Sequence, residues 1–294
     1  MQIGMYTAEL SRPTAAELSR PTAAELFAAV HEHGFTQVQL DLASVCGEQM
    51  PESIDANTLD DIRLSAGRNC VEIAAVNGTF NMIHPQPSVR AEGIRRFESV
   101  ARSCAPIGCE LITLCTGTRS LESMWRAHPE NSTGAAWADL TASMEPLLEI
   151  AERWNVSLGV ECEVSNVIDS AERARKLLDE LRSPRLKIIM DAANLFHAGD
   201  AHAANVRPTI KRAFDLLGDD IALAHGKDIR EGDAISFAPA GQGIVDFDYF
   251  LSLLDEYRYQ GGLILHGMKR EEDFPPSVAF ITQKLRDREA RRPH

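Results

Sequence analysis

Four side chains that commonly bind divalent metal ions follow apolar runs in the second half of the chain. They are Glu161, Asp191, His225 and His266. Each stands where a run rich in Val, Ile or Leu turns abruptly polar, and successive members are about one strand–helix repeat apart. A strand-end cap or an ordinary ion pair would explain any one of them. Four at equivalent positions favour one divalent ion, with Mn²⁺, Zn²⁺, Mg²⁺ and Co²⁺ as the candidates.

These four side chains can bind one ion only if they follow parallel strands whose carboxyl ends meet on one face of the protein. Eight short runs, bounded by Gly, Pro or Asp, are typical of buried strands. They are residues 2–7, 37–42, 71–77, 110–116, 157–163, 186–191, 221–227 and 262–267. Helical stretches separate them, and eight alternating units predict an α/β fold, a (β/α)8 TIM barrel forming a single domain over residues 1–294. Neither a GxGxxG after the first strand nor a GxxxxGK[ST] motif is present, which disfavours the common nucleotide-binding folds.

The connections between strands carry their own signals. Residues 169–172 resemble a capping box, which predicts Asp169 as the N-cap of a helix. Pro146 is expected to kink or restart an earlier helix. Residues 8–15 read AELSRPTA and residues 16–23 repeat them. We interpret this tandem copy as a local duplication in the loop and helix after the first strand, with a lid over the barrel mouth as the alternative.

Further residues are candidates for binding a hydroxylated ligand. Side chains alternate along a strand, so Glu163 faces the same way as Glu161, while Cys162 faces the helices. Lys227 shares a face with His225, where it could contact a substrate hydroxyl or anion, or form a salt bridge with a neighbouring carboxylate. The other predicted substrate-binding residues are Asn81, His84, Thr116, Trp125 and Asn194.

The overall composition disfavours nucleic acid and membranes as partners. The chain has 43 acidic and 30 basic residues, a net charge of −13, which disfavours nucleic acid as a partner. No run of about 18 apolar residues suggests a membrane span, and the first residues do not resemble a signal peptide. The six cysteines form no CxxC pair. Reduced thiols suit the cytoplasm, which is the expected location.

Five segments together resemble a known family. They are VECEVSN (residues 160–166), IIMDAANLF (188–196), AHGKD (224–228), GQGIVDF (241–247) and LILHG (263–267). Their order and spacing are similar to those of the xylose-isomerase-like barrel superfamily of sugar phosphate isomerases and epimerases. The resemblance runs from the first strand to the eighth and is strongest after Leu158.

The resemblance implies roles for the strand-end residues. In that superfamily, a metal is typically held by Glu, Asp, His and Glu on strands five to eight. Glu161, Asp191 and His225 match the first three, but His266 stands where an epimerase has its second Glu. This departure puts the symmetric mechanism with two glutamate bases in doubt. Glu161 is the expected base, and His266 is either the fourth ligand or the opposite proton donor, with Glu271 and Glu272 as alternatives.

The expected activity is that of a metal-dependent isomerase or epimerase. Its small-molecule substrate would be a sugar, sugar phosphate or cyclic polyol ketone, and its intermediate an enediolate. A lyase or dehydratase on the same scaffold and a non-catalytic sugar- or metal-binding barrel are the alternatives. The superfamily also contains abasic-site endonucleases, but Cys115 and Asn194 do not supply the histidines of a trinuclear site. Members often pair, so a homo-oligomer is possible.

Overall fold

Eight parallel strands close into a barrel, as the sequence predicts. The structure is a computed structural model and describes residues 1–10 and 21–291. The barrel strands are β1 (Ile3–Tyr6), β2 (Gln37–Leu40), β3 (Glu72–Asn77), β4 (Leu111–Leu114), β5 (Ser157–Glu161), β6 (Leu186–Asp191), β7 (Ile221–Ile229) and β9 (Leu263–Leu265). Each pairs with its neighbours in chain order, and pairing of β6 with β7 and of β1 with β9 completes the ring.

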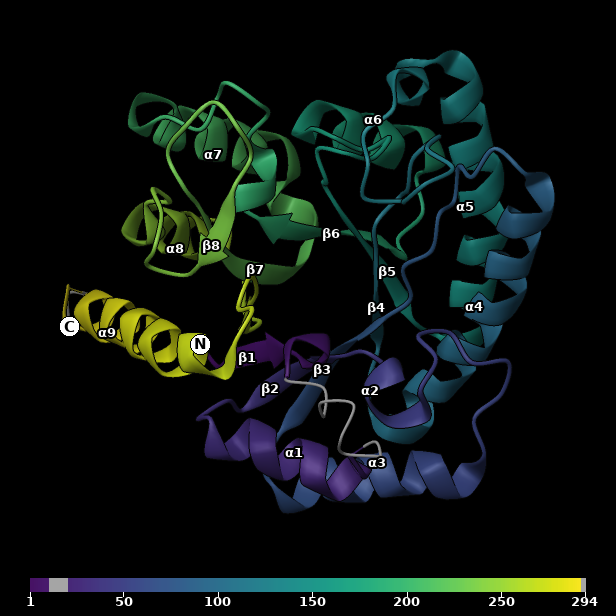
Figure 1. Cartoon of the computed structure of the whole chain (residues 1–294), viewed down its shortest axis with the longest axis horizontal. Helices are drawn as coiled ribbons and strands as arrows, with labels where there is room; N and C mark the ends of the chain where they lie inside the picture. The colour runs from purple at the N-terminus through teal and green to yellow at the C-terminus, as the bar shows by residue number, and fades with distance from the viewer. Residues whose placement is uncertain (11–20, 292–294) are drawn as a thin grey trace.

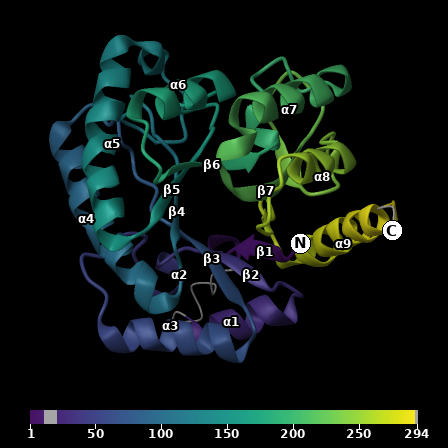
Figure 2. The ribbon, with the colours of Figure 1, turned by 180° about the vertical axis from the view of Figure 1, so that it is seen from behind.

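Helices surround the strands on the outside (Figure 1). They are α1 (Ala23–Glu32), α2 (Ala43–Cys46), α3 (Ala56–Arg68), α4 (Pro87–Ile107), α5 (Gly134–Trp154), α6 (Ala171–Leu181), α7 (Ala203–Leu217), α8 (Phe247–Glu256) and α9 (Phe274–Arg291). In the views of Figures 1 and 2, the chain's first residues lie beside α9. Edge-on contact of Phe274 with Phe35 helps to hold α9 against the barrel.

Two apolar layers hold the barrel together. The larger lies between strands and helices, and every residue of β2 and β4 is buried, as expected for strands covered on both faces. A smaller, separate cluster fills the barrel interior with side chains from β3, β4, β6, β7 and β9. Its members are Ala75, Leu111, Ile189, Leu223 and Ile264. This apolar cluster lies below the carboxyl ends of β5 and β6, where Glu161 and Asp191 stand.

Strand β7 continues beyond the barrel into a hairpin that the sequence did not predict. Its last residues pair antiparallel with β8 (Phe237–Pro239). The carboxylate of Asp228 accepts backbone hydrogen bonds from Ile229, Gly241, Gly243 and Val245, at 2.9–3.0 Å. A Cβ at Gly243 would collide with the Ile229 carbonyl oxygen. The Gly-Gln-Gly turn is therefore fixed by one buried carboxylate.

Two local predictions need correction and one stays open. The N-cap of α6 is Ser170, not Asp169, whose carboxylate instead accepts a hydrogen bond from the Ser170 hydroxyl. Helix α5 runs continuously through Pro146, so the helix does not restart there, while a kink stays a prediction. Most of the tandem repeat, residues 11–20, lies outside the described residues, so its interpretation stays a prediction. In the described part of the chain, none of the helices has the length and apolar character needed to cross a membrane.

Candidate active site

Three of the predicted metal ligands converge at the carboxyl ends of β5, β6 and β7. Glu161 and Asp191 are the last residues of their strands, and the β6–β7 register places His225 directly opposite Asp191. One potential ligand atom from each of the three residues lies within 4.8 Å of the others. The strand ends thus bring together residues far apart in sequence, on the face where barrel enzymes carry their active sites.

His225 is fixed between this cluster and β2. Its Nδ1 lies 3.3 Å from Glu161 Oε1 and 3.8 Å from Asp191 Oδ2. On the other side of the ring, Nε2 lies 2.8 Å from Oε1 of Gln39. An amide oxygen accepts a hydrogen bond from Nε2–H, which leaves Nδ1 free to bind a cation. With Nε2 directed at Gln39, Nδ1 is the nitrogen of His225 that a metal would bind.

Lys227 and Asn194 connect the two carboxylates. The Lys227 ammonium lies 3.1 Å from Asp191 Oδ2 and donates to Asn194 Oδ1 at 2.7 Å. The Asn194 amide in turn donates to Glu161 Oε1 at 2.7 Å. The salt bridge that the sequence left open for Lys227 is thus present, and Lys227 also lines the adjoining pocket.

The charged groups shift one another's pKa values. Burial, which outweighs the attraction of Lys227, raises the pKa of Asp191. Burial also opposes the charge on Glu161, but His225 and Lys227 outweigh it and hold its pKa below the usual range. Burial and repulsion by His225 lower the pKa of His266 well below its usual value. Its imidazole is therefore neutral at neutral pH.

The donor set fits a divalent ion. Two carboxylates and one imidazole suit Zn²⁺, Mn²⁺ and similar cations. Within residues 1–10 and 21–291, no donor makes a well-aligned hydrogen bond to the buried Asp191 Oδ2, which lies 3.1 Å from the Lys227 ammonium and 3.8 Å from His225 Nδ1. Buried carboxylate oxygens usually accept hydrogen bonds, so this oxygen has the capacity to bind a cation.

His266 follows β9 and lies beside the three-residue group without belonging to it. Its ring is stacked on Tyr6, with centroids 5.0 Å apart, and faces His225 with centroids 4.2 Å apart. Its Nδ1 lies 3.6 Å from Glu9 Oε1. The buried Nε2 has no hydrogen-bond partner among the described residues. The roles of His266 as fourth ligand or proton donor stay predictions.

Several site residues were missed by the sequence reasoning. Glu9, in the short helix η1 (Thr7–Glu9) after β1, accepts hydrogen bonds from the backbone N–H groups of Gly267 and Met268. Burial, partly offset by these hydrogen bonds, raises the pKa of Glu9 to about 7. The Tyr6 hydroxyl donates to Asp41 at 2.6 Å, which holds the ring against His266. Polar residues in or just after β1 and β2 were the available signal.

A pocket of about 760 Å³ opens beside the cluster, large enough for a small ligand. Charged and polar groups from three strand ends line one part of it, and apolar side chains line the rest. The lining residues are Ala8, Glu9, Leu10, Lys227, Ile235, Ser236, Phe237, His266, Gly267, Met268 and Lys269. The pocket thus combines functional groups with an apolar wall.

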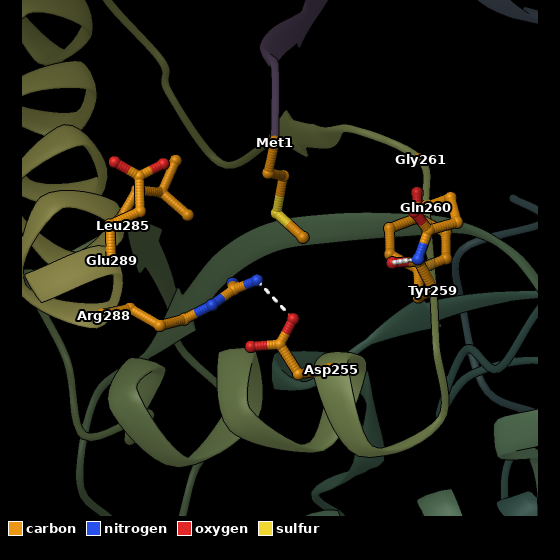
Figure 3. A pocket seen from close by; sticks show the side chains of 8 residues that line it. All are labelled: Met1, Asp255, Tyr259, Gln260, Gly261, Leu285, Arg288 and Glu289. Atoms are coloured by element: carbon orange, nitrogen blue, oxygen red, sulfur yellow. Dashed lines mark hydrogen bonds and ion pairs between the residues drawn. The ribbon is translucent and has the colours of Figure 1, made fainter. Parts of the chain in front are cut away.

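A smaller pocket of about 160 Å³ lies at the opposite, amino-terminal end of the strands (Figure 3). It is lined by Met1, Asp255, Tyr259, Gln260, Gly261, Leu285, Arg288 and Glu289. Figure 3 shows Arg288 reaching toward Asp255, with which it forms a 2.5 Å ion pair. This pair joins α9 to α8, so we interpret the pocket as a gap in the packing of these helices at the amino-terminal end of the barrel, not as a ligand site.

The remaining predicted substrate-binding residues lie around the cluster at varying distances. Burial raises the pKa of Glu163, which also interacts electrostatically with Lys227 and Glu161. Thr116 is buried and accepts a hydrogen bond from the Ile168 backbone. Asn81 is engaged by the backbone of Thr118. His84 Nδ1 accepts a hydrogen bond from the backbone N–H of Gln86, and Trp125 is 55% exposed. Substrate binding by these residues stays a prediction.

Comparison with known proteins identifies the family. Residues 27–284 match the model of the xylose isomerase-like TIM barrel family. The chain belongs to this family. No curated protein sequence matches it significantly.

Solved structures of this barrel type share the fold at low identity. The apo form of 3-keto-D-glucoside 4-epimerase YcjR from E. coli has a TM-score of 0.71 and 19% identity, covering 96% of this chain and 99% of that one. A D-tagatose 3-epimerase-like protein has a TM-score of 0.72 and 18% identity, covering 97% of both chains. The IolI protein with a bound zinc atom has a TM-score of 0.66 and 17% identity, covering 98% and 97%. At these identities the likeness concerns the fold.

Proposed function

We propose that the protein is a metal-dependent isomerase or epimerase of a sugar, sugar phosphate or cyclic polyol ketone. The observation that carries the proposal is the buried convergence of Glu161, Asp191 and His225 at the catalytic face of the barrel. The epimerase names of similar folds agree with this reaction class. The pocket beside the cluster combines polar groups with an apolar wall, which suits a small hydroxylated molecule.

The chain's own residues can divide the reaction between them. Bound divalent metal would stabilise the negative charge that develops on a carbonyl oxygen when the neighbouring carbon loses its proton. Glu161 Oε1 is held by Asn194, whereas among the described residues the one hydrogen-bonding contact of Oε2 is a weak one with the Cys115 thiol at 3.8 Å. Oε2 is therefore the atom that takes the proton. Lys227 lines the pocket and can bind a substrate oxygen.

Metal analysis of purified protein tests the site directly. Wild type is expected to hold about one divalent ion per chain, and Glu161→Gln and Asp191→Asn to lose it under the same conditions. Glu163→Gln is the matched control, because it removes a nearby carboxylate outside the three-residue group and should keep the metal. Absence of uptake by wild type in excess metal would reject the metal-dependent activity.

Solvent exchange tests the reaction class. Wild type incubated with ketoses and inososes in D₂O is expected to incorporate deuterium at the carbon next to the carbonyl. Glu161→Gln should slow this exchange by about 10²-fold or more, because a positioned base contributes a factor of this size. Products that have lost water would instead indicate a lyase or dehydratase. Ligand binding without exchange would indicate a binding protein.

A further inference from the structure

We propose that Glu9, in η1 directly after β1, is a positioning residue of this site. It orients His266 so that Nε2 faces the reaction centre as a hydrogen-free acceptor. This inference rests on the proposed function. His266 lies where the resemblance expects a carboxylate on the last strand. The adjacent strand β1 instead brings a carboxylate to the other side of the same imidazole.

The contacts of Glu9 are specific to the segment that carries His266. Oε1 accepts a hydrogen bond from Gly267 at 2.8 Å, and Oε2 accepts one from Met268 at 3.1 Å. Gly267 has φ +82°, and a Cβ there would lie 2.9 Å from the Ala238 carbonyl oxygen. Glycine therefore permits the turn that points this N–H at Glu9. The carboxylate thereby fixes the two residues directly after His266.

The orientation of the imidazole follows from its two nitrogens. Nδ1 is 3.6 Å from Glu9 Oε1, which is longer than a hydrogen bond but close enough for the negative charge of the carboxylate to favour hydrogen on this nitrogen. We therefore expect Nδ1 to carry the hydrogen and Nε2 to lack it. Nε2 is buried and has no partner in the described part of the chain. An acceptor so placed is available to a metal ion or to a substrate hydroxyl.

The placement of Glu9 also argues for a functional role. Its side chain is 18% exposed and lines the same pocket as Lys227 and His266. In the described residues, no lysine or arginine forms an ion pair with it. A buried carboxylate without such a cation lowers stability, and groups of this kind concentrate at functional sites.

The tautomer of His266 provides a test that needs neither metal nor substrate. Metal-free protein labelled with [¹⁵N]histidine would be examined by long-range ¹H–¹⁵N spectra well above pH 7, where Glu9 is ionised, with the His266 signals assigned from His266→Gln. Wild type is expected to show hydrogen on Nδ1, and Glu9→Gln to shift His266 toward the Nε2–H form. Glu25→Gln is the matched control, since Glu25 stands in the same Ala-Glu-Leu sequence but only caps α1.

Exchange kinetics then separate a functional role from a purely structural one. Glu9→Gln should keep its metal and lower kcat for deuterium exchange by about 10- to 100-fold, the usual effect of losing a group that orients a ligand, with KM changed less than about threefold. Identical His266 spectra in wild type and Glu9→Gln would overturn the proposal. A shifted tautomer with unchanged kcat would overturn it too. Failure of wild type to bind metal would reject the proposed function, while the spectra would still decide the role of Glu9.

Discussion

The carboxylates of the site differ in how their charge is compensated. Glu161 and Asp191 interact with Lys227, whereas Glu9 has two backbone N–H donors. Burial raises the pKa of Glu9 from 4.5 to about 7. The folded state therefore binds the Glu9 proton more tightly than the unfolded state does. Its ionisation lowers stability as pH rises from about 4.5 to about 7.

Replacing Glu9 by Gln should remove this pH-dependent cost. Between pH 4.5 and pH 8, wild type should lose up to about 3 kcal/mol more of its free energy of unfolding than Glu9→Gln does, because only wild type has the Glu9 carboxyl group that ionises. Any loss of hydrogen bonds with Gly267 and Met268 in the variant should be the same at both pH values. Urea unfolding at pH 4 and pH 8 measures the difference, with Glu25→Gln as control. An identical difference at both pH values would show that Glu9 does not titrate in this window.

Lys227 compensates the carboxylates in the metal-free protein. Its ammonium forms an ion pair with Asp191, and removing one partner of a buried pair typically costs about 3–5 kcal/mol. Metal-free Lys227→Met should therefore lose stability, and Mn²⁺ should restore much of the loss by replacing the missing positive charge. Lys227→Arg, which keeps the charge, should respond to Mn²⁺ as wild type does. An equal rise in Tm with Mn²⁺ in both variants would contradict this account.

Among individual residues, site residues at the end of a strand could be predicted from the sequence more readily than site residues in other positions. Glu161 and Asp191 stand at a sharp change from apolar to polar, which one strand reveals by itself. Gln39 lies within β2, where the pattern does not show which face enters the barrel. Glu9 contacts Gly267 only because β1 pairs with β9 when the barrel closes. That contact depends on tertiary structure that local patterns do not encode.

The β7–β8 hairpin depends on a single carboxylate. Asp228 Oδ1 accepts hydrogen bonds from Ile229 and Val245, and Oδ2 accepts them from Gly241 and Gly243. In Asp228→Asn, an amide NH₂ would replace one oxygen and face buried N–H donors. We expect a loss of about 2–4 kcal/mol in the free energy of unfolding, because buried polar groups would be left unsatisfied.

Urea unfolding and hydrogen exchange of the hairpin measure this effect. Asp233→Asn is the matched control on the same hairpin, because its side chain is 93% exposed. It should change stability by less than about 0.5 kcal/mol. Faster exchange throughout residues 229–245 in Asp228→Asn alone would support the assignment. Equal behaviour of the two variants would contradict it.

Element boundaries were harder to predict than the elements themselves. The capping pattern placed the start of α6 one residue early, because Asp169 and Ser170 are both good N-caps and differ only in backbone geometry. Pro146 did not interrupt α5, whose buried residues, among them Met144 and Leu147, offset the lost hydrogen bond. Strand β8 was missed because three residues ending in proline carry no strand pattern.

For the molecule as a whole, alternation of strands and helices was sufficient to predict the barrel. Right-handed connections leave few ways to arrange eight such units, and the closed ring is one of them. The sequence could not supply the strand register, which decides that Asp191 lies opposite His225. It also could not show that the interior is plugged by small and medium apolar side chains. Closure of the ring brings the carboxyl ends of β5, β6 and β7 together, and with them the three potential metal ligands.

The net charge of the molecule leads to a last prediction, on nucleic acid. The chain carries a net charge of −13, and binding to DNA requires cationic groups that displace counterions. In the described residues, the potential ligand group has three members, and Cys115 and Asn194 lie beside it.

We expect neither binding nor cleavage of a duplex with an abasic site at 50 mM salt with Zn²⁺, Mn²⁺ or Mg²⁺. Fluorescence anisotropy and gel analysis, with an intact duplex as control, test this. Binding whose affinity falls steeply with salt would show that the protein contacts phosphates. Cleavage that Asp191→Asn abolishes would show that a phosphate reaches the metal cluster. The two results together would reassign the metal site to phosphodiester hydrolysis.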